Sequence, residues 1–420
     1  MQDLTPDVLI VGAGAAGLAA AIFTRRLDPT CSAVIVDGAR APGAKILVSG
    51  GSRCNVTNAT VSERDFSGGR PAIVRRVLRA LPVDRTVAFF AQIGVRLHEE
   101  AGGKLFPDSN RSRDVLAALL RELDAAGATL LAARRVTAIA RRAADFVVDT
   151  NAGVIAARRV VLATGGQSLP KTGSDGAGYT IARSLGHSIV PTTPALVPLL
   201  LDPDRDGAIH RDLAGVSQDV ALAVRIDGAI AVRLTGALLW THFGVSGPVV
   251  LDASRHWLRA TLEHRRVEIE VNFLPEQRFE TIDARWTGLA GERPRTSIRT
   301  ALATMIPAAV ADAMLQHLRL GADTSLAHLS RMDRRRLSHA LTAWPLPVSG
   351  SRGYNYAEAT AGGVDLSEID PATMESRRCP GLFLVGEILD VDGRIGGFNF
   401  QWAWSSGRAA ASGLTRRSSA

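Results

Sequence analysis

Three glycines near the amino terminus are spaced so that a protein backbone can hold a pyrophosphate. Gly12, Gly14 and Gly17 form a Gly-x-Gly-x-x-Gly motif between the apolar run 7–11 and an alanine-rich helical stretch. The first glycine permits a tight turn, the second lets the backbone approach the phosphates, and the third lets the helix pack closely on the strand. We therefore expect the N–H groups at the start of this helix to bind an anion.

A carboxylate at the end of the next apolar run fits the other end of a dinucleotide. Asp37 follows the run 33–36, twenty residues after Gly17. At this position it can accept hydrogen bonds from an adenosine ribose, and it would repel a 2′-phosphate. A dinucleotide-binding βαβ unit has the same order of elements: strand, glycine turn, helix, strand and acid. The motif leaves NAD and FAD both open, because both cofactors use it.

Later segments return to the same site and favour an extended ligand with a second reactive end. Residues 45–58 read KILVSGGSRCNVTN, a polar loop soon after the ribose acid. Two further apolar strands stop at glycines, in 163–166 and in 386–387. The stretch 396–401, GGFNFQ, opens a helix of small residues. We expect its positive end to face the N1–C2=O edge of a flavin, which favours FAD.

Composition indicates a folded protein of more than one domain. The chain of 420 residues is longer than an ordinary single domain. Its 46% of hydrophobic and 21% of charged residues are typical of globular chains. Cys31, Cys54 and Cys379 form no CxxC pair, which favours a reducing compartment. The apolar stretch 8–23 follows acids in place of a basic region, and no stretch is long enough to span a membrane. We expect a cytoplasmic protein without membrane contact.

The net charge of +8 and the isoelectric point near 10.2 raise the question of a nucleic-acid partner. The arginines are scattered among acids, and neither a long basic run nor an RNA-binding aromatic motif accompanies them. We therefore expect a small-molecule substrate and no nucleic acid, with the arginines attracting anionic ligands.

The middle of the chain changes in character and predicts an insertion. Residues 192–295 contain proline-spaced apolar runs typical of antiparallel β structure, and 296–346 follow a helical pattern. The FAD-binding domain is then expected in two parts, 1–191 and 347–420. The predicted fold class is α/β, with a Rossmann-type sheet.

Several blocks resemble signature motifs of the BaiN-like/YhiN-like FAD flavoproteins, NAD(P)/FAD-dependent oxidoreductases that include a bile-acid enone reductase and an aminoacetone oxidase. The blocks are SGGSRCNVTN, TGALLWTHFGVSGP, ATAGGV, TMES and VGEILDVDGRIGGFNFQWAWSSG, within a match over residues 7–412. The resemblance implies a Rossmann-type FAD domain, an inserted β-barrel-like domain and a small helical domain. Ser52, Phe398 and Phe400 depart from the glycine, tyrosine and leucine that are common in the family.

Non-covalent FAD is the expected cofactor. No second Gly-x-Gly-x-x-Gly follows a strand, so any NAD(P)H is expected to bind only transiently. The motifs and the resemblance together imply FAD contacts from Gly12, Gly14, Ala15, Ala16, Gly17, Asp37, Lys45, Gly51, Arg53, Cys54, Asn55, Val136, Ala163, Thr164, Gly165, Gly386, Glu387, Asp392, Gly397, Phe398 and Asn399.

Four further features have alternative interpretations. Cys54 has no partner cysteine, so packing beside the flavin is favoured over a redox thiol. His242 is the candidate general acid or base, although a buried hydrogen-bonded histidine or a hinge is the favoured alternative. Glu387 either reaches the ribityl or pyrophosphate through water or caps the sheet edge. Asp390 and Asp392 lack a third ligand at suitable spacing, so no metal site is expected.

The sequence favours an FAD-dependent oxidoreductase. In this hypothesis hydride passes through flavin N5 between a small organic substrate or NAD(P)H and an acceptor, either an enone or oxygen. The alternative is a non-catalytic flavoprotein or an RNA-associated binding protein in which FAD is structural. The motifs leave the substrate, the electron donor and the oligomeric state open.

Overall fold

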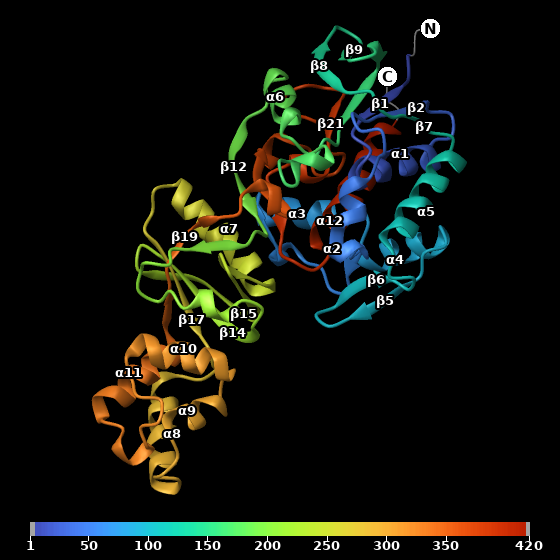
Figure 1. Ribbon diagram of the computed structural model, residues 1–420. Helices are drawn as coiled ribbons and strands as arrows, with labels where there is room; N and C mark the ends of the chain where they lie inside the picture. Colours follow the sequence, from blue (N-terminus) through green and yellow to red (C-terminus); the bar gives the residue numbers. More distant parts are fainter. Residues whose placement is uncertain (1–4, 417–420) are drawn as a thin grey trace. The chain divides into compact units, whose positions relative to one another are not determined.

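A computed structural model describes residues 5–416, and the chain divides into two compact units (Figure 1). The first unit combines both ends of the chain, up to Pro194 and from Glu358 onward, and the second is Ala195–Ala357. The division differs from the expected one, which placed residues 347–357 with the cofactor domain and separated a helical part at 295/296.

The first unit is built on a five-stranded parallel sheet. Its elements are β1 (Val8–Val11), α1 (Ala15–Leu27), β2 (Ala33–Val36), β7 (Thr129–Leu131), β11 (Arg159–Leu162) and β21 (Leu382–Leu384). The strand order is β21-β11-β1-β2-β7, and every pair is parallel. All residues of β1 and β2 are buried, which explains why both are unbroken apolar runs. The order reverses at β1, and ligands of such sheets bind beyond the carboxyl ends of the strands at that point.

The last helix, α12 (Phe398–Leu414), packs against α1 through small residues. A Cβ added at Gly407 would lie 2.8 Å from the carbonyl oxygen of Ala16 and 2.9 Å from the Cβ of Ala19. The two helices therefore approach each other almost backbone to backbone. This contact brings the carboxyl end of the chain against the helix that follows the glycine turn.

Smaller elements complete the first unit. Its helices include α2 (Ala44–Ser52), α3 (Pro71–Leu78), α4 (Val83–Gln92), α5 (Ser112–Ala125) and α6 (Ala177–Ser184), with single turns η1 (Glu63–Asp65), η2 (Pro170–Thr172), η6 (Leu366–Glu368) and η7 (Gly386–Ile388). Short sheets join β3 (Thr57–Asn58) and β5 (Leu97–Glu100) to β6 (Lys104–Pro107), β4 (Phe66–Gly68) to β22 (Val391–Gly393), β12 (Ile189–Ala195) to β20 (Ala359–Val364), and β8 (Val136–Arg141) to β9 (Phe146–Thr150) and β10 (Gly153–Ala157). Several of these sheets join segments far apart in the sequence.

The second unit contains a seven-stranded antiparallel sheet. Its strands are β13 (Leu199–Leu201), β14 (Ser217–Ile226), β15 (Ala229–Thr241), β16 (Gly244–Ser246), β17 (Val267–Asn272), β18 (Trp344–Leu346) and β19 (Val348–Ser351). The order is β18-β17-β14-β15-β16-β13-β19. Only Pro347 separates β18 from β19, so the strands at the two ends of this order follow each other directly along the chain. The sheet must curl round on itself, as the implied barrel-like insert requires.

Helices share one hydrophobic core with this sheet. They are α7 (Pro248–Leu262), α8 (Phe279–Glu292), α9 (Ile298–Ala303), α10 (Ala308–Leu318) and α11 (Arg331–Thr342), with single turns η3 (His210–Leu213), η4 (Leu326–His328) and η5 (Tyr354–Tyr356). Two of them, α7 and α8, lie inside the range 192–295 that was expected to be β-rich. An α/β fold with a Rossmann-type sheet and an inserted antiparallel domain is nevertheless the observed class. Within residues 5–416, no helix is long and apolar enough to cross a membrane.

Candidate cofactor site

The glycine turn has two positions that the protein itself fills and one that it leaves open. A Cβ at Gly12 would lie 2.4 Å from the carbonyl oxygen of Ala163, and one at Gly17 would lie 1.9 Å from the carbonyl oxygen of Gly12. A Cβ at Gly14 would meet no atom within 4 Å. Gly12 and Gly17 are therefore required by packing within the chain, whereas Gly14 borders free space where a phosphate can approach the backbone.

The amino end of α1 supplies the donors for such a phosphate. Gly14 is the N-cap, and the first helical hydrogen bond runs from the N–H of Leu18 to the carbonyl of Gly14 at 2.9 Å. The N–H groups of Ala15, Ala16 and Gly17 precede that bond and are unpaired within the helix. No acidic side chain lies in the first turn. The end of the helix is thus positive and suited to an anion.

Asp37 joins the glycine turn to the end of β2. One carboxylate oxygen accepts the N–H of Ala13 at 2.7 Å, and the other accepts the N–H of Ala39 at 2.8 Å. Each oxygen keeps a second lone pair, which can accept a ribose hydroxyl. The carbonyl of Asp37 accepts the N–H of Arg134 at 2.8 Å, so the segment leading to Val136 runs past the same end of the sheet.

The ends of β11 and β21 reach the same turn. Ala163 donates its N–H to the carbonyl of Val11 at 2.9 Å and leads into Thr164 and Gly165. A Cβ at Gly386 would lie 2.7 Å from the Cβ of Ala16, at the start of α1. The ends of β1, β11 and β21 therefore bring together segments from three distant parts of the sequence.

Lys45 and Glu387 form an ion pair that sequence reasoning did not anticipate. Lys45 Nζ lies 2.5 Å from Glu387 Oε2 and 2.6 Å from Ser168 Oγ. The other oxygen, Glu387 Oε1, accepts the Ser168 hydroxyl at 2.6 Å and the N–H of Thr360 at 2.9 Å. Glu387 therefore bonds to side chains and backbone of several segments, which goes beyond capping a sheet edge. Thr360 lies in the ATAGGV block, and no local pattern there indicated a role for it.

Two tryptophans fix the amino-terminal part of α12 against the site. The indole N–H of Trp402 donates to the carbonyl of Gly386 at 3.1 Å, and that of Trp404 donates to the carbonyl of Val56 at 2.9 Å. Both side chains are buried. These hydrogen bonds set the direction in which the helix begins, and the buried indole rings also fill the core.

A buried amide oxygen beside the start of α12 lacks a partner. Asn55 Oδ1 is buried, and no hydrogen-bond partner lies within the described residues. It lies next to Gly397, the N-cap of α12, where an added Cβ would be 2.9 Å away. The side chain of Asn399 is already engaged, since Oδ1 accepts the N–H of Gly393 and Nδ2 donates to its carbonyl. An unpaired buried acceptor indicates a ligand that donates a hydrogen bond here.

These features fit FAD. The pyrimidine edge of a flavin has an N–H between two carbonyl oxygens, which matches the Asn55 acceptor beside the unpaired N–H groups of the α12 amino end. The open space at Gly14, the positive end of α1 and the Asp37 carboxylate match the pyrophosphate and ribose.

The side chains of Cys54 and Arg53, two of the expected FAD contacts, are held by contacts within the protein. Burial raises the pKa of Cys54 to about 12, so its thiol stays protonated at neutral pH and serves packing better than redox chemistry. The guanidinium of Arg53 lies 2.6 Å from Glu100 and 4.0 Å from the ring centre of Phe106. It is thereby held against the β5–β6 hairpin.

His242 lies in the second unit, and its side chain is exposed. Its ring meets the Phe243 ring edge-on, with 5.1 Å between centres. The alternative that His242 is a buried, hydrogen-bonded histidine is therefore wrong. Within residues 5–416, no three His, Cys, Asp or Glu side chains gather as metal ligands, and Asp392 is buried in β22.

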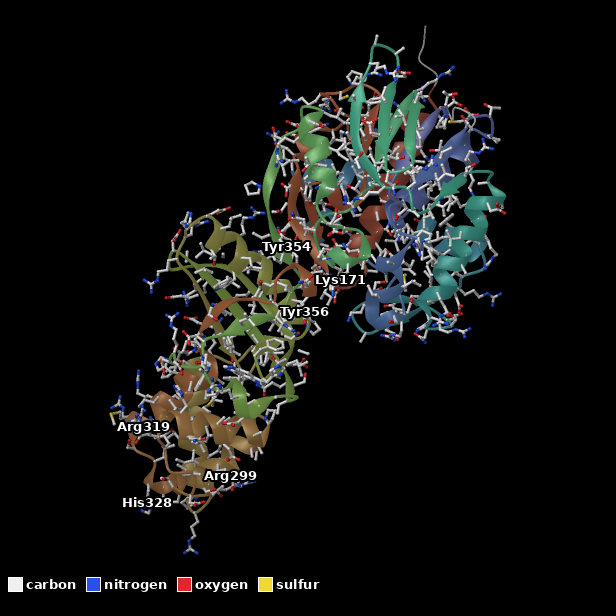
Figure 2. All side chains as sticks on the ribbon, turned by 45° about the horizontal axis from the view of Figure 1, so that its top comes forward. Lys171, Arg299, Arg319, His328, Tyr354 and Tyr356 are labelled. Carbon is white, nitrogen blue, oxygen red and sulfur yellow. The ribbon has the colours of Figure 1, made fainter. Side chains whose placement is uncertain are left out.

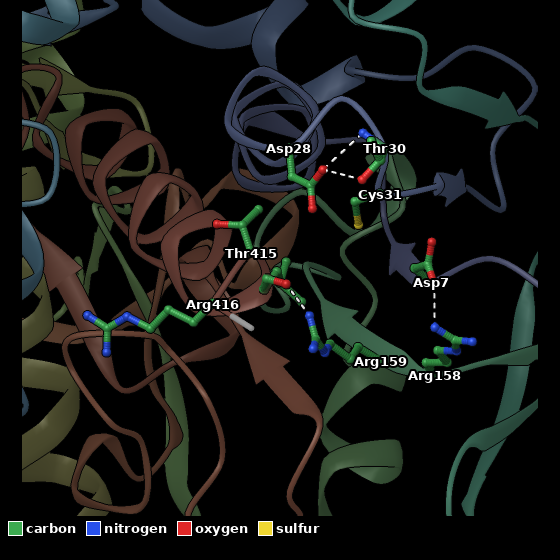
Figure 3. Close-up of a pocket in the computed structure, with 9 residues that line it drawn as sticks. Asp7, Asp28, Thr30, Cys31, Arg158, Arg159, Thr415 and Arg416 are labelled. Carbon is green, nitrogen blue, oxygen red and sulfur yellow. Dashed lines mark hydrogen bonds and ion pairs between the residues drawn. The ribbon is translucent and has the colours of Figure 1, made fainter. Parts of the chain in front are cut away.

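A separate hollow of about 330 Å³ lies at the opposite edge of the parallel sheet (Figure 3). Its lining includes Asp7 and Arg159, which flank the amino ends of β1 and β11. Arg158 pairs with Asp7 there at 3.1 Å. None of the expected FAD contacts lines it.

The family model described as HI0933-like protein Rossmann domain matches residues 6–413, nearly the whole chain. The chain belongs to the HI0933-like family. The resemblance to BaiN-like/YhiN-like flavoproteins is thereby confirmed, and with it FAD as the cofactor and oxidoreduction as the activity. Within this family a non-catalytic flavoprotein is not favoured.

Relatives within the family have two kinds of name. A ribosomal RNA dihydrouridine synthase of Escherichia coli strain K12 is 33% identical and matches 97% of this chain and 98% of its own length. A 3-dehydro-bile acid delta(4,6)-reductase of Clostridium scindens is 32% identical with the same coverage. A second ribosomal RNA dihydrouridine synthase, from Haemophilus influenzae, is 31% identical. The expectation that nucleic acid plays no part is therefore not supported.

One solved structure shows the fold of the family in a distant protein. A mutated form of FrdA from the quinol fumarate reductase of Escherichia coli superposes with a TM-score of 0.52 at 14% identity, over 99% of this chain and 70% of that one. At this identity the likeness concerns the fold alone.

Proposed function

We propose that this protein is an FAD-dependent reductase of a carbon–carbon double bond conjugated with a carbonyl group, and that its substrate is a uracil base in RNA. The observation that carries the proposal is the pair of relatives matched over nearly the whole chain. The name of the Clostridium scindens relative describes reduction of double bonds in an oxo steroid. The name of the Escherichia coli relative describes saturation of the uracil C5–C6 bond. Both reactions reduce an alkene next to a carbonyl.

The reaction adds a hydride to the carbon β to the carbonyl and a proton to the α carbon. Bound FAD supplies the hydride-transfer chemistry. A reduced nicotinamide provides the two electrons in this proposal and leaves oxidised, and it binds transiently because no second dinucleotide motif follows a strand. The exposed imidazole of His242 is the candidate proton donor.

The residues of the first unit hold and tune the cofactor in this proposal. The amino end of α1 binds the pyrophosphate, and Asp37 binds the ribose. Asn55 accepts the flavin N–H, while the positive end of α12 stabilises negative charge on the pyrimidine ring. Lys45 and Glu387 position each other through their ion pair at the ends of the strands.

The charge of the protein favours RNA over a steroid. Forty-nine basic residues face 41 acidic ones, and a polyanion gains affinity from each basic group it meets. On α3 and its N-cap, Arg70, Arg76 and Arg79 are exposed and form no ion pair with the described residues. This helix contacts both η1 and α12. Arg394, which precedes α12, pairs with Asp65 of η1 at 2.8 Å.

Reduced-flavin turnover with two substrates tests the proposal. The purified protein should lose its visible flavin absorbance on anaerobic addition of NADPH or NADH, and uridine-containing ribosomal RNA should restore it. Mass spectrometry of the digested RNA should find a uridine heavier by two hydrogen atoms. Restoration by a 3-oxo-steroid diene alone would keep the reaction class and refute the RNA substrate. Failure with both would refute the proposal.

The same proposal implies that the protein works in the cytoplasm. The relatives named for ribosomal RNA are bacterial, and bacterial ribosomal RNA is cytoplasmic. The three cysteines of this chain, which are all free and buried, also suit a reducing environment.

A further inference from the structure

A partly exposed group of aromatic rings in the second unit contacts a guanidinium. The Arg352 guanidinium lies 3.4 Å from the ring centre of Tyr356 and 4.7 Å from that of Phe243. Tyr356 is a large side chain with half its surface, 50%, exposed, and it comes from η5 together with Tyr354 (Figure 2). The exposed His242 adjoins Phe243. We call Phe243, Arg352 and Tyr356 the stacking cluster.

The sheet holds the two halves of the stacking cluster together. Strand β13 pairs with β16 on one side and with β19 on the other, so that Leu199 faces both Val245 and Ser351. Phe243 precedes β16, and Arg352 follows β19. Gly244 has a φ of +151°, and a Cβ there would lie 2.3 Å from the carbonyl oxygen of Leu199. The backbone of the hairpin that carries Phe243 is therefore packed tightly against β13.

The charge within the cluster is not neutralised locally. Among the described residues, no carboxylate forms an ion pair with Arg352, and the guanidinium rests against aromatic faces. An unpaired cation beside the half-exposed Tyr356 ring and the partly buried Phe243 ring combines a phosphate-binding group with flat apolar surfaces. Proteins that bind single-stranded nucleic acids use this combination, because a base stacks on the ring while the cation meets the backbone.

We propose that the stacking cluster binds a base of single-stranded RNA, with the base stacked on the Tyr356 ring and a phosphate near Arg352. The proposal rests on the proposed function, because an RNA substrate must expose its target base before the base can react. A uracil in a loop or unpaired segment provides that base. A steroid nucleus is aliphatic and carries no phosphodiester, so it would not combine stacking of a flat base on Tyr356 with a backbone phosphate near Arg352.

Binding of two matched oligonucleotides tests the stacking cluster. The probes are a fluorescent oligouridylate and an abasic ribose–phosphate chain of the same length, titrated with the FAD-loaded protein by fluorescence anisotropy. Tyr356→Ala should weaken oligouridylate binding at least fivefold and change abasic-chain binding less than twofold. Tyr356→Phe keeps the ring and should bind both probes like the parent. Retention of the flavin spectrum in each variant checks that the first unit is intact.

Other outcomes distinguish this inference from the function on which it rests. Equal losses for both probes, or no loss for Tyr356→Ala, would overturn the stacking role. In turnover with uridine-containing RNA, Tyr356→Ala should raise KM at least fivefold with kcat changed less than threefold, and an unchanged KM would also overturn it. A parent protein that binds oligouridylate through Tyr356 and reduces no uridine would refute the proposed function alone.

Discussion

The backbone N–H of Ala13 donates to the Asp37 carboxylate at 2.7 Å, which locks the glycine turn to the end of the second strand. Asp37 also accepts the N–H of Ala39 at 2.8 Å. The residue proposed to bind the ribose therefore also shapes the turn that is proposed to bind the pyrophosphate. A single substitution should affect both ends of the adenosine diphosphate.

Asp37→Ala should weaken FAD binding at least tenfold, a loss of about 1.4 kcal/mol. The reason is the loss of charged hydrogen bonds, worth roughly 1.5–3 kcal/mol each, to the ribose and to the turn. Fluorescence titration of the apoprotein with FAD measures the effect. Asp37→Asn, which keeps one acceptor oxygen, should lose less.

Turnover of the Asp37→Ala variant should return to most of the parent value at saturating FAD, because the ribose lies far from the reactive flavin ring. Persistent loss at full occupancy would place Asp37 near the chemistry. Unchanged FAD affinity would assign the ribose to another residue.

Gly14 and Gly17 should respond differently to an added side chain. Gly14→Val places its side chain in open space, since no atom lies within 4 Å of the added Cβ, so the apoprotein should fold normally and retain no FAD. In Gly17→Ala the new Cβ would lie 1.9 Å from a backbone oxygen, so the apoprotein itself should be destabilised. Thermal unfolding of both apoproteins and the FAD content of the purified proteins separate the two effects. Full FAD retention in Gly14→Val would exclude this turn as the phosphate site.

Cys54→Ala should leave turnover within about twofold of the parent at saturating FAD. Burial raises the pKa of this thiol to about 12, so almost no thiolate exists at neutral pH to act as a nucleophile or redox group. Native protein should also react slowly with a maleimide, because all three cysteines are buried. Loss of turnover in the FAD-saturated variant would instead show that the sulfur takes part in the reaction.

Local sequence patterns were sufficient to predict the structure of the turn that is proposed to bind the adenosine diphosphate. The three glycines and Asp37 are close in sequence, and one βαβ unit sets their geometry. Long-range partners were beyond such reasoning. Lys45 and Glu387 are 342 residues apart in the chain, and their contact depends on how the folded unit brings α2 and η7 together.

The same distinction applies to the fold. Unbroken apolar runs predicted the parallel strands, since burial of both faces leaves a strong signal. Helix α8 was missed because it buries little, chiefly Ile282 and Trp286, so its periodicity is weak. The exposure of His242 depends on the β15–β16 hairpin, and no property of the residue itself predicts it.

A buried polar network outside the cofactor site gives the protein an acid-sensitive contact. His187 Nδ1 lies 2.8 Å from Glu368 Oε2, and its Nε2 lies 2.8 Å from Ser376 Oγ. Burial alone would raise the pKa of Glu368, but hydrogen bonds from the N–H of Ser188, from His187 and from Arg378 outweigh it and hold the pKa below its ordinary value. The network joins the segment after α6 to the segment before β21.

The stability contributed by Glu368 should therefore be complete above pH 4.5, its ordinary pKa, and be lost as the pH falls through the lower pKa of the folded state. Glu368→Gln should destabilise the protein by about 2 kcal/mol at pH 7, because a charged acceptor of several hydrogen bonds is replaced. Urea unfolding of parent and variant at pH 7 and at successively lower pH measures the difference, which should shrink as Glu368 becomes protonated in the parent.

Glu99→Gln, at an exposed carboxylate of the same unit, is the matched control and should change stability by less than about 0.5 kcal/mol at every pH. A difference between parent and Glu368→Gln that stayed constant down to about pH 3 would show that the carboxylate charge contributes nothing to holding these two segments together.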